Sequence, residues 1–344
     1  MISCTAIRDE SDTFFSLEPV DRSWLTDLLG DQVRFNASMR RYTTLGVGGP
    51  ADALVTATDL KTLKALISGL HHRSIPWMVV GGGSNLLVRD GGIRGVVIVL
   101  GAHYKGIDEV SSGDTPAELS VKAGTRLATL CRYAIDHGMA GMAFALGIPG
   151  SVGGAIAMNA GTAIGSIQDV LISISVLWPT GQIQQIEKKD LAFDYRQLRL
   201  PVSDVSVMGS GYSGAPCGVI IDGIFRFEPA DTRQLLLDAQ KIKAERRQRQ
   251  PLGVASAGCF FKNPSVGLSA GQLIDMAGLK GKRVGDAQVS MCHGNFIINR
   301  GQAHATDILG LAEIVKNRVA AQFGIQLEPE VIIVGESNHA SKSV

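Results

Sequence analysis

Two glycine-rich segments have compositions that suit phosphate binding. The first spans residues 79–88 and reads V-V-G-G-G-S-N-L-L-V. Glycines allow backbone N–H groups to approach an anion closely, and the following serine and asparagine add side-chain donors. The alternative is a tight strand-to-strand turn, for which two glycines would suffice. The third glycine and the Ser-Asn pair favour contact with a phosphate or a diphosphate.

The second segment, residues 147–161, reads G-I-P-G-S-V-G-G-A-I-A-M-N-A-G. Five glycines and a proline in fifteen residues argue against a regular helix or a central strand. The apolar residues argue against a solvated linker. We therefore expect an ordered loop that packs against either another backbone segment or a cofactor. Two such loops in neighbouring blocks favour a ligand with a diphosphate.

A thiol, a guanidinium and a carboxyl group stand in three further motifs. Cys259 lies in S-A-G-C-F-F-K-N-P, Arg196 ends F-D-Y-R, and Glu330 lies in L-E-P-E-V. Cys259 is either an acid/base group beside anion-binding donors or a buried structural cysteine. Arg196 could be a surface ion-pair partner, and Glu330 a partly buried polar end of an apolar strand. The G-x-G-x-x-G match at 209–214 precedes a β-branched run rather than a helix, so it is not a dinucleotide fingerprint.

The composition excludes several classes of protein. Lys and Arg number 33 against 32 Asp and Glu, so no strong net charge attracts the chain to nucleic acid or membrane. Five scattered cysteines without a C-x-x-C pair predict neither a disulfide framework nor a metal site. No secretory signal or membrane span is apparent. These features fit a cytoplasmic protein.

Hydrophobic periodicity predicts the elements that position these motifs. Asp59 is expected to cap the start of the helix at 60–70, and Gly324 to end the helix at 306–323. The expected helices span 24–29, 60–70, 127–135, 231–250, 269–279 and 306–323. The expected strands span 77–80, 86–88, 95–100, 170–177, 218–227, 294–299 and 330–334. Residues 201–214 are expected to form a surface loop.

Taken together, the motifs resemble the UDP-N-acetylenolpyruvoylglucosamine reductase family, also called UDP-N-acetylmuramate dehydrogenase. The resemblance runs from T-T-L-G-V-G-G-P-A-D at Thr43 through both glycine-rich segments and Y-R. It continues through R-Q-P-L, S-A-G-C-F-F-K-N-P, A-G-L-K-G, N-F-I-I-N and E-P-E-V. It covers about 290 residues in the family's order, which is far more specific than any one glycine loop.

The resemblance implies an α+β fold with a two-subdomain FAD-binding region of the p-cresol methylhydroxylase type and an α+β substrate-binding domain. The implied boundaries are an N-terminal extension at 1–38, an FAD-binding domain at 39–228 divided near 101–118, a C-terminal substrate-binding domain at 229–336, and a tail at 337–344.

The resemblance also assigns site residues. Arg196, Cys259 and Glu330 fall on the family's catalytic positions. The implied contacts to noncovalent FAD are Gly81, Gly82, Gly83, Ser84, Asn85, Leu86, Gly147, Ile148, Pro149, Gly150, Ser151, Gly153, Gly154 and Asn159. Candidates for binding the substrate are Tyr195, Lys262, Asn263, Gln288 and Asn295. No metal is implied.

The implied reaction reduces an enolpyruvyl ether to a lactyl ether, with NADPH as co-substrate and FAD carrying the hydride. Arg196 and Glu330 would stabilise the enolate that develops, and Cys259 would give a proton to the α-carbon. The reference pKa of cysteine, about 8.5, keeps a thiol mostly protonated at neutral pH, as a donor requires. A UDP-sugar would be the partner molecule, and a monomer is expected.

The chain departs from the family pattern at four places. Cys259 stands where serine is common, Leu198 replaces the serine of Y-R-x-S, Ile332 stands where arginine is frequent, and the loop after Arg196 is longer than in the short form. The chain shows no clear equivalent of the substrate-clamping tyrosine loop of the family's long form, for which Tyr212 is a weak candidate. Two alternatives remain: a flavin oxidase of the same broad fold, against which the absence of a histidine beside Ser84-Asn85 argues, and a flavin- or nucleotide-sensing protein without chemistry.

Overall fold

The computed structural model describes residues 17–111, 117–201, 218–265 and 267–338. The surface loop expected at 201–214, the G-x-G-x-x-G match and Tyr212 lie almost entirely outside these residues. The chain forms two compact units. The first unit comprises residues 1–35, 53–82 and 95–244, and the second unit comprises 36–52, 83–94 and 245–344.

The first sheet has the strand order β1-β2-β5-β3, and β3 pairs with β5 in parallel. Helix α2 (Leu60–His72) begins at Asp59, whose Oδ1 accepts a hydrogen bond from Thr62 N at 2.8 Å, as the sequence predicts. The apolar faces of α1 (Pro19–Leu29) and α2 are buried in one hydrophobic core with this sheet. The strands are β1 (Val33–Ser38), β2 (Pro50–Ala57), β3 (Trp77–Val80) and β5 (Ile93–Leu100).

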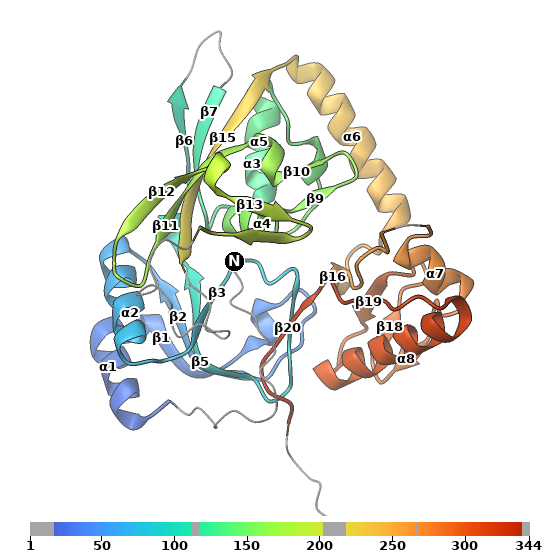
Figure 1. Cartoon of the computed structure of the whole chain (residues 1–344), viewed down its shortest axis with the longest axis horizontal. Coiled ribbons are helices and arrows are strands. Elements are labelled where there is room, and N and C mark those ends of the chain that lie inside the picture. The colour runs from blue at the N-terminus through green and yellow to red at the C-terminus, as the bar shows by residue number, and fades with distance from the viewer. Residues whose placement is uncertain (1–16, 112–116, 202–217, 266, 339–344) are drawn as a thin grey trace, which may run out of the picture. The chain divides into compact units, whose positions relative to one another are not determined.

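A second, antiparallel sheet of the first unit has the order β12-β11-β15-β7-β6 (Figure 1). Helix α4 packs against β7 and β15, and α3 packs against α4, around a separate hydrophobic core. The elements are β6 (Ile107–Ser111), β7 (Ala117–Lys122), α3 (Leu127–Asp136), β8 (Met139–Ala140), α4 (Val152–Ala157), β9 (Gly161–Thr162), β10 (Gly165–Ser166), α5 (Ile167–Val170), β11 (Leu171–Leu177), β12 (Ile183–Glu187), β13 (Ala192–Asp194), β14 (Gln197–Arg199) and β15 (Val219–Pro229).

The second glycine-rich segment differs from its prediction as a loop without a helix. Residues 152–157 form the short helix α4, and Ser151 caps it by accepting a hydrogen bond from Gly154 N at 3.2 Å. The glycine at 153 has a packing role, because a Cβ there would lie 2.8 Å from the Cβ of Ala123. The expectation of no helix in this segment was therefore wrong, since close packing explains a glycine as well as a turn does.

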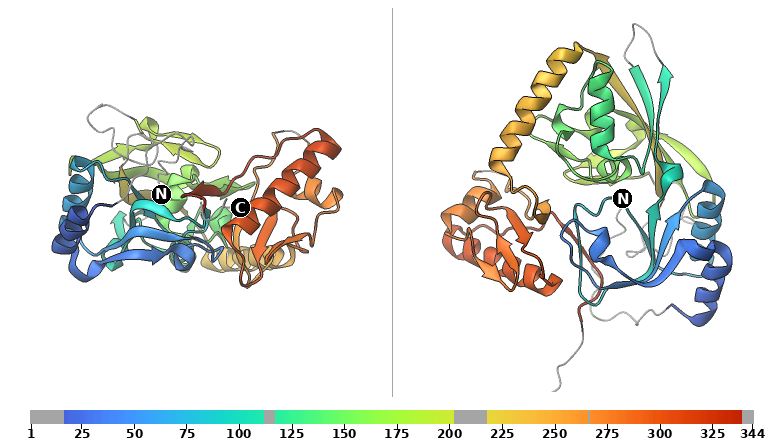
Figure 2. Two further views of the ribbon diagram at one scale, coloured as in Figure 1. Left: turned by 90° about the horizontal axis from the view of Figure 1, so that it is seen from below. Right: turned by 180° about the vertical axis from the view of Figure 1, so that it is seen from behind.

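The second unit is built on the antiparallel sheet β16-β19-β18-β17. Helix α8 packs along these strands and α7 packs against α8 (Figure 2). A short parallel pair, β4 with β20, belongs to the same unit. The elements are β4 (Leu86–Val88), β16 (Ala255–Cys259), α7 (Ala270–Met276), β17 (Arg283–Val284), β18 (Ala287–Val289), β19 (Phe296–Asn299), α8 (Ala305–Phe323) and β20 (Ile332–Val334).

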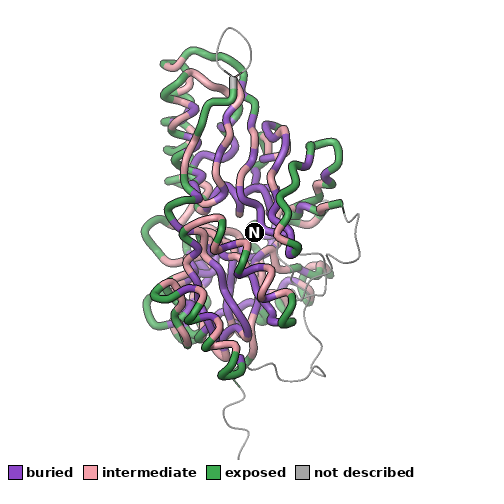
Figure 3. The backbone as a smooth tube through the Cα atoms, turned by 90° about the vertical axis from the view of Figure 1, so that its left-hand side faces the viewer, coloured by how far each residue is buried: buried purple, intermediate pink, exposed green. Residues whose placement is uncertain are grey.

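Helix α6 (Thr232–Arg249) contains the basic run at 241–249, so this run is the polar end of a helix, as expected. The division between the units falls within this helix, and it also cuts strands β1, β2 and β5. Buried backbone follows the central strands, and exposed backbone follows the outer turns and helix faces (Figure 3). Among the described residues, no helix has the length and apolarity needed to cross a bilayer.

Candidate functional site

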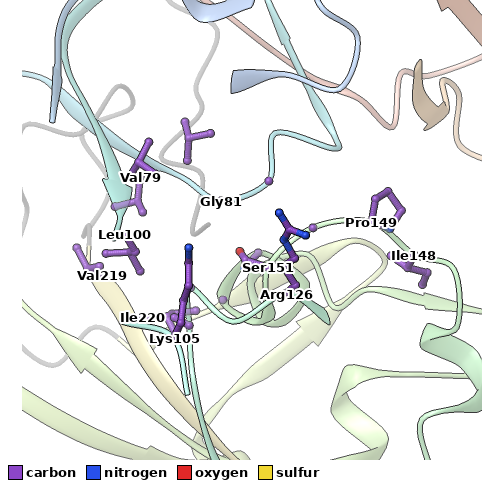
Figure 4. Close-up of a pocket in the computed structure, with 18 of the residues that line it drawn as sticks. Val79, Gly81, Leu100, Lys105, Arg126, Ile148, Pro149, Ser151, Val219 and Ile220 are labelled. Carbon is purple, nitrogen blue, oxygen red and sulfur yellow. Dashed lines mark hydrogen bonds between the residues drawn. The ribbon is translucent and has the colours of Figure 1, made fainter. Parts of the chain in front are cut away.

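A cavity of about 470 Å³ lies in the first unit, at the ends of strands β3 and β5 (Figure 4). The two glycine-rich segments meet at its wall. The lining residues that the sequence predicts as cofactor contacts are Gly81, Gly82, Ile148, Pro149, Gly150, Ser151, Gly153 and Gly154. The other predicted contacts, Gly83, Ser84, Asn85, Leu86, Gly147 and Asn159, are not among the lining residues.

The close approach of the two segments explains their glycines. A Cβ on Gly82 would lie 2.8 Å from the Cα of Gly150, and a Cβ on Gly81 would collide with the Oγ of Ser151. Only residues without side chains allow the two backbones to come this close. The cavity wall therefore consists largely of bare backbone, which suits contact with phosphate oxygens.

Two cations that no motif indicates also line the cavity. Lys105 follows a short 3-10 turn, and Arg126 directly precedes helix α3. Figure 4 shows both side chains pointing toward the side of the cavity formed by Val79 and Gly81. Neither side chain makes a hydrogen bond or an ion pair with another described residue. Neither cation belongs to a motif in the sequence, so no pattern distinguishes them from ordinary surface residues.

The remaining wall of the cavity is apolar. Trp77, Val79, Leu100, Val219 and Ile220 supply it. A cavity with bare backbone, two cations that have no partner among the described residues, and an apolar wall fits a ligand that carries both phosphates and flat rings. FAD is such a ligand, because its diphosphate joins two ring systems.

Arg196 lies at the tip of a hairpin in the same unit. Strands β13 and β14 pair so that Asp194 faces Gln197, which leaves Tyr195 and Arg196 as a two-residue turn. Arg196 has φ +58, and its guanidinium carbon lies 5.1 Å from the centre of the Tyr195 ring. Leu198, where the family commonly has serine, is only 4% exposed and belongs to the hydrophobic core.

Asn159 anchors this hairpin. Its Oδ1 accepts a hydrogen bond from Gln168 N at 3.2 Å, and its Nδ2 donates to the Asp194 carbonyl at 3.5 Å. The side chain is buried. The structure thus gives Asn159 a role in holding the segment that carries Arg196.

Cys259 lies at the end of β16 in the second unit, half-buried before two buried phenylalanines. Asn295, which is 2% exposed, forms hydrogen bonds with Phe260 and Phe261, the two residues after Cys259. Its Oδ1 accepts a hydrogen bond from Phe261 N at 2.9 Å, and its Nδ2 donates to the Phe261 carbonyl at 2.7 Å. The Asn295 carbonyl also accepts from Phe260 N at 2.8 Å.

Glu330 lies beside the segment that follows Cys259. Glu330 N donates to the Phe260 carbonyl at 2.8 Å, and Phe261 forms an antiparallel bridge with Pro329. Glu330 is half-buried, as its position before an apolar strand predicts. The regular strand β20 begins at Ile332, two residues later than expected. The structure therefore brings the Cys259 and Glu330 segments together within one unit, while Arg196 belongs to the other.

Arg246, near the end of α6, is a further cation close to this pair. Burial lowers the pKa of Arg246, and the Cys259 thiolate acts in the opposite direction. The two groups therefore interact electrostatically. A cation near a thiol favours loss of its proton.

Comparison with known proteins supports the same interpretation. Residues 250–334 match the family model for the C-terminal domain of UDP-N-acetylenolpyruvoylglucosamine reductase, and residues 51–187 match an FAD-binding domain model. A reductase of that name from Desulfosudis oleivorans is 48% identical over 316 residues, covering 92% of this chain and 98% of the relative. The corresponding protein of Syntrophus aciditrophicus is 40% identical and covers 91% of this chain and 95% of its own length.

The chain belongs to the UDP-N-acetylenolpyruvoylglucosamine reductase family. A crystal structure of such a reductase from Thermus caldophilus is similar in fold, with a TM-score of 0.70 and 37% sequence identity. That similarity covers 87% of this chain and 97% of the Thermus chain.

Family membership confirms several predictions. The fold class is α+β with an FAD-binding region, the cofactor is FAD, and the protein is an oxidoreductase. The family assignment favours the reductase over a flavin oxidase or a sensing protein. The domain boundaries and the roles of individual site residues stay predictions.

The other residues predicted to bind the substrate of the reductase family lie in the second unit, apart from exposed Tyr195. Lys262 Nζ forms an exposed ion pair with Glu328 at 3.1 Å. Asn263 Oδ1 accepts from Ala270 N at the start of α7, at 3.1 Å. Gln288 donates to the Gly281 carbonyl at 3.1 Å and accepts from Arg300 at 3.0 Å. Within the described ranges, no group of His, Cys, Asp and Glu side chains is arranged to hold a metal ion.

Proposed function

We propose that this chain is an NADPH-dependent reductase that converts UDP-N-acetylglucosamine enolpyruvate to UDP-N-acetylmuramate for peptidoglycan synthesis in the cytoplasm. The observation that carries the proposal is 48% identity to the UDP-N-acetylenolpyruvoylglucosamine reductase of Desulfosudis oleivorans over nearly the whole of both chains. Bound FAD, once reduced by NADPH, supplies the hydride that reduces the enolpyruvyl double bond. We further propose that the protein acts as a monomer on this one UDP-sugar.

The glycine-lined cavity suits the diphosphate of FAD. Backbone N–H groups near Gly82 and Gly150 would face the phosphates, and the Arg126 guanidinium would neutralise their charge. Lys105 adds a second cation at the same wall. The apolar side chains from Trp77 to Ile220 would exclude water from the ring systems.

Arg196, Glu330 and Cys259 would divide the work on the substrate. The guanidinium is permanently charged and can form a fork with a carboxylate, so Arg196 suits the enolate that develops beside the substrate carboxylate. The carboxyl group of Glu330 would form a hydrogen bond with the same enolate. Cys259 would then protonate the α-carbon, and Arg246 would stabilise the thiolate that remains. Tyr195, Lys262, Asn263, Gln288 and Asn295 are the proposed supports for the sugar nucleotide.

Replacement of Cys259 separates the two half-reactions. We expect Cys259→Ala to leave reduction of the flavin by NADPH near the wild-type rate, because that step needs no proton at carbon. Reoxidation by the enolpyruvyl substrate should slow by about 10²- to 10⁴-fold, the usual contribution of one general acid. Anaerobic stopped-flow absorbance of the flavin measures both rates.

Two further variants control this experiment. Cys292→Ala removes an exposed thiol of the same unit, whose Sγ contacts the Gln248 carbonyl at 3.6 Å, and should change neither rate. Cys259→Ser keeps a hydroxyl donor and should retain substantial activity. Equal losses in both half-reactions of Cys259→Ala would contradict the role given to the thiol.

A further inference from the structure

Asn85, which follows the three glycines and Ser84 of the first glycine-rich segment, is hydrogen-bonded to Glu330 and to Ile332. Its Nδ2 donates to the Glu330 carbonyl at 3.0 Å. Its own carbonyl accepts a hydrogen bond from Ile332 N at 3.0 Å. The contacts continue directly into the parallel pair of β4 with β20, in which Leu86 faces Ile332. One asparagine thus extends a strand pairing up to the candidate acid.

Both backbone polar groups of Glu330 are therefore held. The N–H donates to the Phe260 carbonyl, and the carbonyl accepts from the Asn85 amide. Because its N–H and its carbonyl are both paired, the backbone of Glu330 is fixed, and with it the direction in which the Cα–Cβ bond leaves the chain. The backbone from which the Glu330 side chain extends is thus held by one residue beside Cys259 and one residue of the glycine motif.

The same glycine turn is also connected to the strand that leads to Cys259. Thr44 N donates to the Gly83 carbonyl at 3.1 Å, and Thr44 Oγ1 donates to the Ser256 carbonyl at 2.6 Å. Gly83 has φ +60, and a Cβ there would collide with the Tyr42 carbonyl. The turn at 83–85 is consequently connected by hydrogen bonds to two other segments of the second unit.

We propose that Asn85 is a positioning residue for Glu330. The inference rests on the proposed function, because Glu330 must act on the substrate for its direction to matter. Asn85 does not line the cavity that fits FAD, and its amide nitrogen bonds Glu330. Its effect on the reaction therefore passes through the carboxyl group.

The test uses the holoenzyme and compares Asn85→Ala and the isosteric Asn85→Asp with wild type. Asn85→Asp replaces the donor with an oxygen that faces the Glu330 carbonyl oxygen. We expect both variants to keep the FAD dissociation constant and the rate of reduction by NADPH within about threefold. Reoxidation by the enolpyruvyl substrate should slow by about 10- to 100-fold, since small displacements of a reacting group have effects of this size. Deuterium exchange of the holoenzyme across 328–334 should accelerate in both variants.

A double-variant cycle distinguishes positioning from a separate contribution. If Asn85 acts through Glu330, then Asn85→Ala combined with Glu330→Gln should be no slower in reoxidation than Glu330→Gln alone. Asn299→Ala is the matched control, because this buried amide of the same unit donates to the Leu45 carbonyl at 2.9 Å and bonds the turn at 301–303. Any decrease in the reoxidation rate caused by Asn299→Ala should multiply with the decrease caused by Glu330→Gln. Thermal unfolding shows whether each variant folds. If Asn85→Ala fails to fold, Asn85→Asp is used for the test.

The outcomes separate the two proposals. Weaker FAD binding with parallel losses in both half-reactions would show Asn85 to be a cofactor contact and would overturn the inference. Unchanged reoxidation in Asn85→Asp, or multiplicative effects in the double variant, would also overturn it. If Glu330→Gln itself leaves reoxidation unchanged, the role of Glu330 in the proposed function fails, and the inference fails with it.

Discussion

Arg196 occupies a backbone conformation that few residues other than glycine adopt. Its φ of +58 lies in the left-handed region, which costs a non-glycine residue about 1–2 kcal/mol. The motif F-D-Y-R predicts the identity of this residue, and the resemblance predicts its role. The conformation was not predictable, because it follows from the pairing of Asp194 with Gln197 on either side of the turn. A guanidinium retained despite this cost is consistent with a functional requirement at the position.

Exchanging Arg196 for glycine and for alanine separates strain from function. We expect Arg196→Gly to be more stable than Arg196→Ala by about 1 kcal/mol, since glycine alone adopts this φ freely. Both variants lack the guanidinium and should be equally impaired in reoxidation by the enolpyruvyl substrate. Urea unfolding measures the first quantity and stopped-flow absorbance the second. Equal stabilities would mean that the turn imposes no strain on residue 196.

Individual helices and strands follow local pattern closely, whereas their stabilising contacts come from distant residues. Helix α8 was predicted from its apolar positions and from Gly324, which adopts the left-handed conformation at its end. Its first turn is capped by Asp90, which accepts hydrogen bonds at 2.9 Å from Ala305 N and Thr306 N, more than 200 residues away in sequence. No local pattern indicates such a contact. Helix α4 was missed for the related reason that its glycines serve tertiary packing.

Removal of the Asp90 cap should destabilise the second unit. Burial alone would raise the pKa of Asp90, but hydrogen bonds from Thr306 and Ala305 outweigh burial and lower the pKa below its usual 3.8. A lowered pKa in the folded state adds stability above about pH 4, and this stability is lost as the pH falls through the folded-state pKa. Asp90→Ala should therefore cost about 1–2 kcal/mol of unfolding free energy at pH 7 and progressively less below pH 4.

A carboxylate elsewhere on the same helix provides the comparison for Asp90. Glu313 forms an exposed ion pair with Lys316 at 3.0 Å, which should contribute under about 0.5 kcal/mol. Denaturant unfolding of Asp90→Ala and Glu313→Ala across pH measures both effects. A pH-independent loss in Asp90→Ala would show that the carboxylate charge does not stabilise the helix.

At the scale of the whole chain, the two units and the cavity depend on segments that are remote in sequence. The second unit gathers residues 36–52 and 83–94 with the C-terminal hundred residues, whereas sequence reasoning expects contiguous domains. The cavity takes residues from five regions of the first unit, among them Lys105 and Arg126. Residues of both glycine motifs line the cavity, and their contact with phosphate stays a prediction. The two cations had no signal, because an isolated Lys or Arg has meaning only when the fold places it beside the cavity.

Alanine at Gly82 tests whether the two glycine segments must touch. A Cβ there would lie 2.8 Å from the Cα of Gly150, so the segments must separate. We expect FAD binding to weaken by at least about tenfold, as measured by fluorescence titration of the apoprotein. Gly310→Ala in α8 is the control, because its Cβ would meet Val284 only at 3.9 Å. That exchange should leave FAD binding unchanged and stabilise the protein by about 0.5–1 kcal/mol. Unaltered FAD affinity in Gly82→Ala would show that the cavity wall tolerates a side chain.

The hairpin of β13 and β14 constrains how this segment can change during evolution. Successive strand residues face opposite sides, so inserting or deleting one residue between Ala192 and Arg199 would turn Leu198 out of its apolar surroundings and redirect the guanidinium. Substitutions at exposed strand positions leave that geometry intact. Homologous chains should accordingly vary in composition along this hairpin while keeping its length, with insertions accumulating after residue 199 instead.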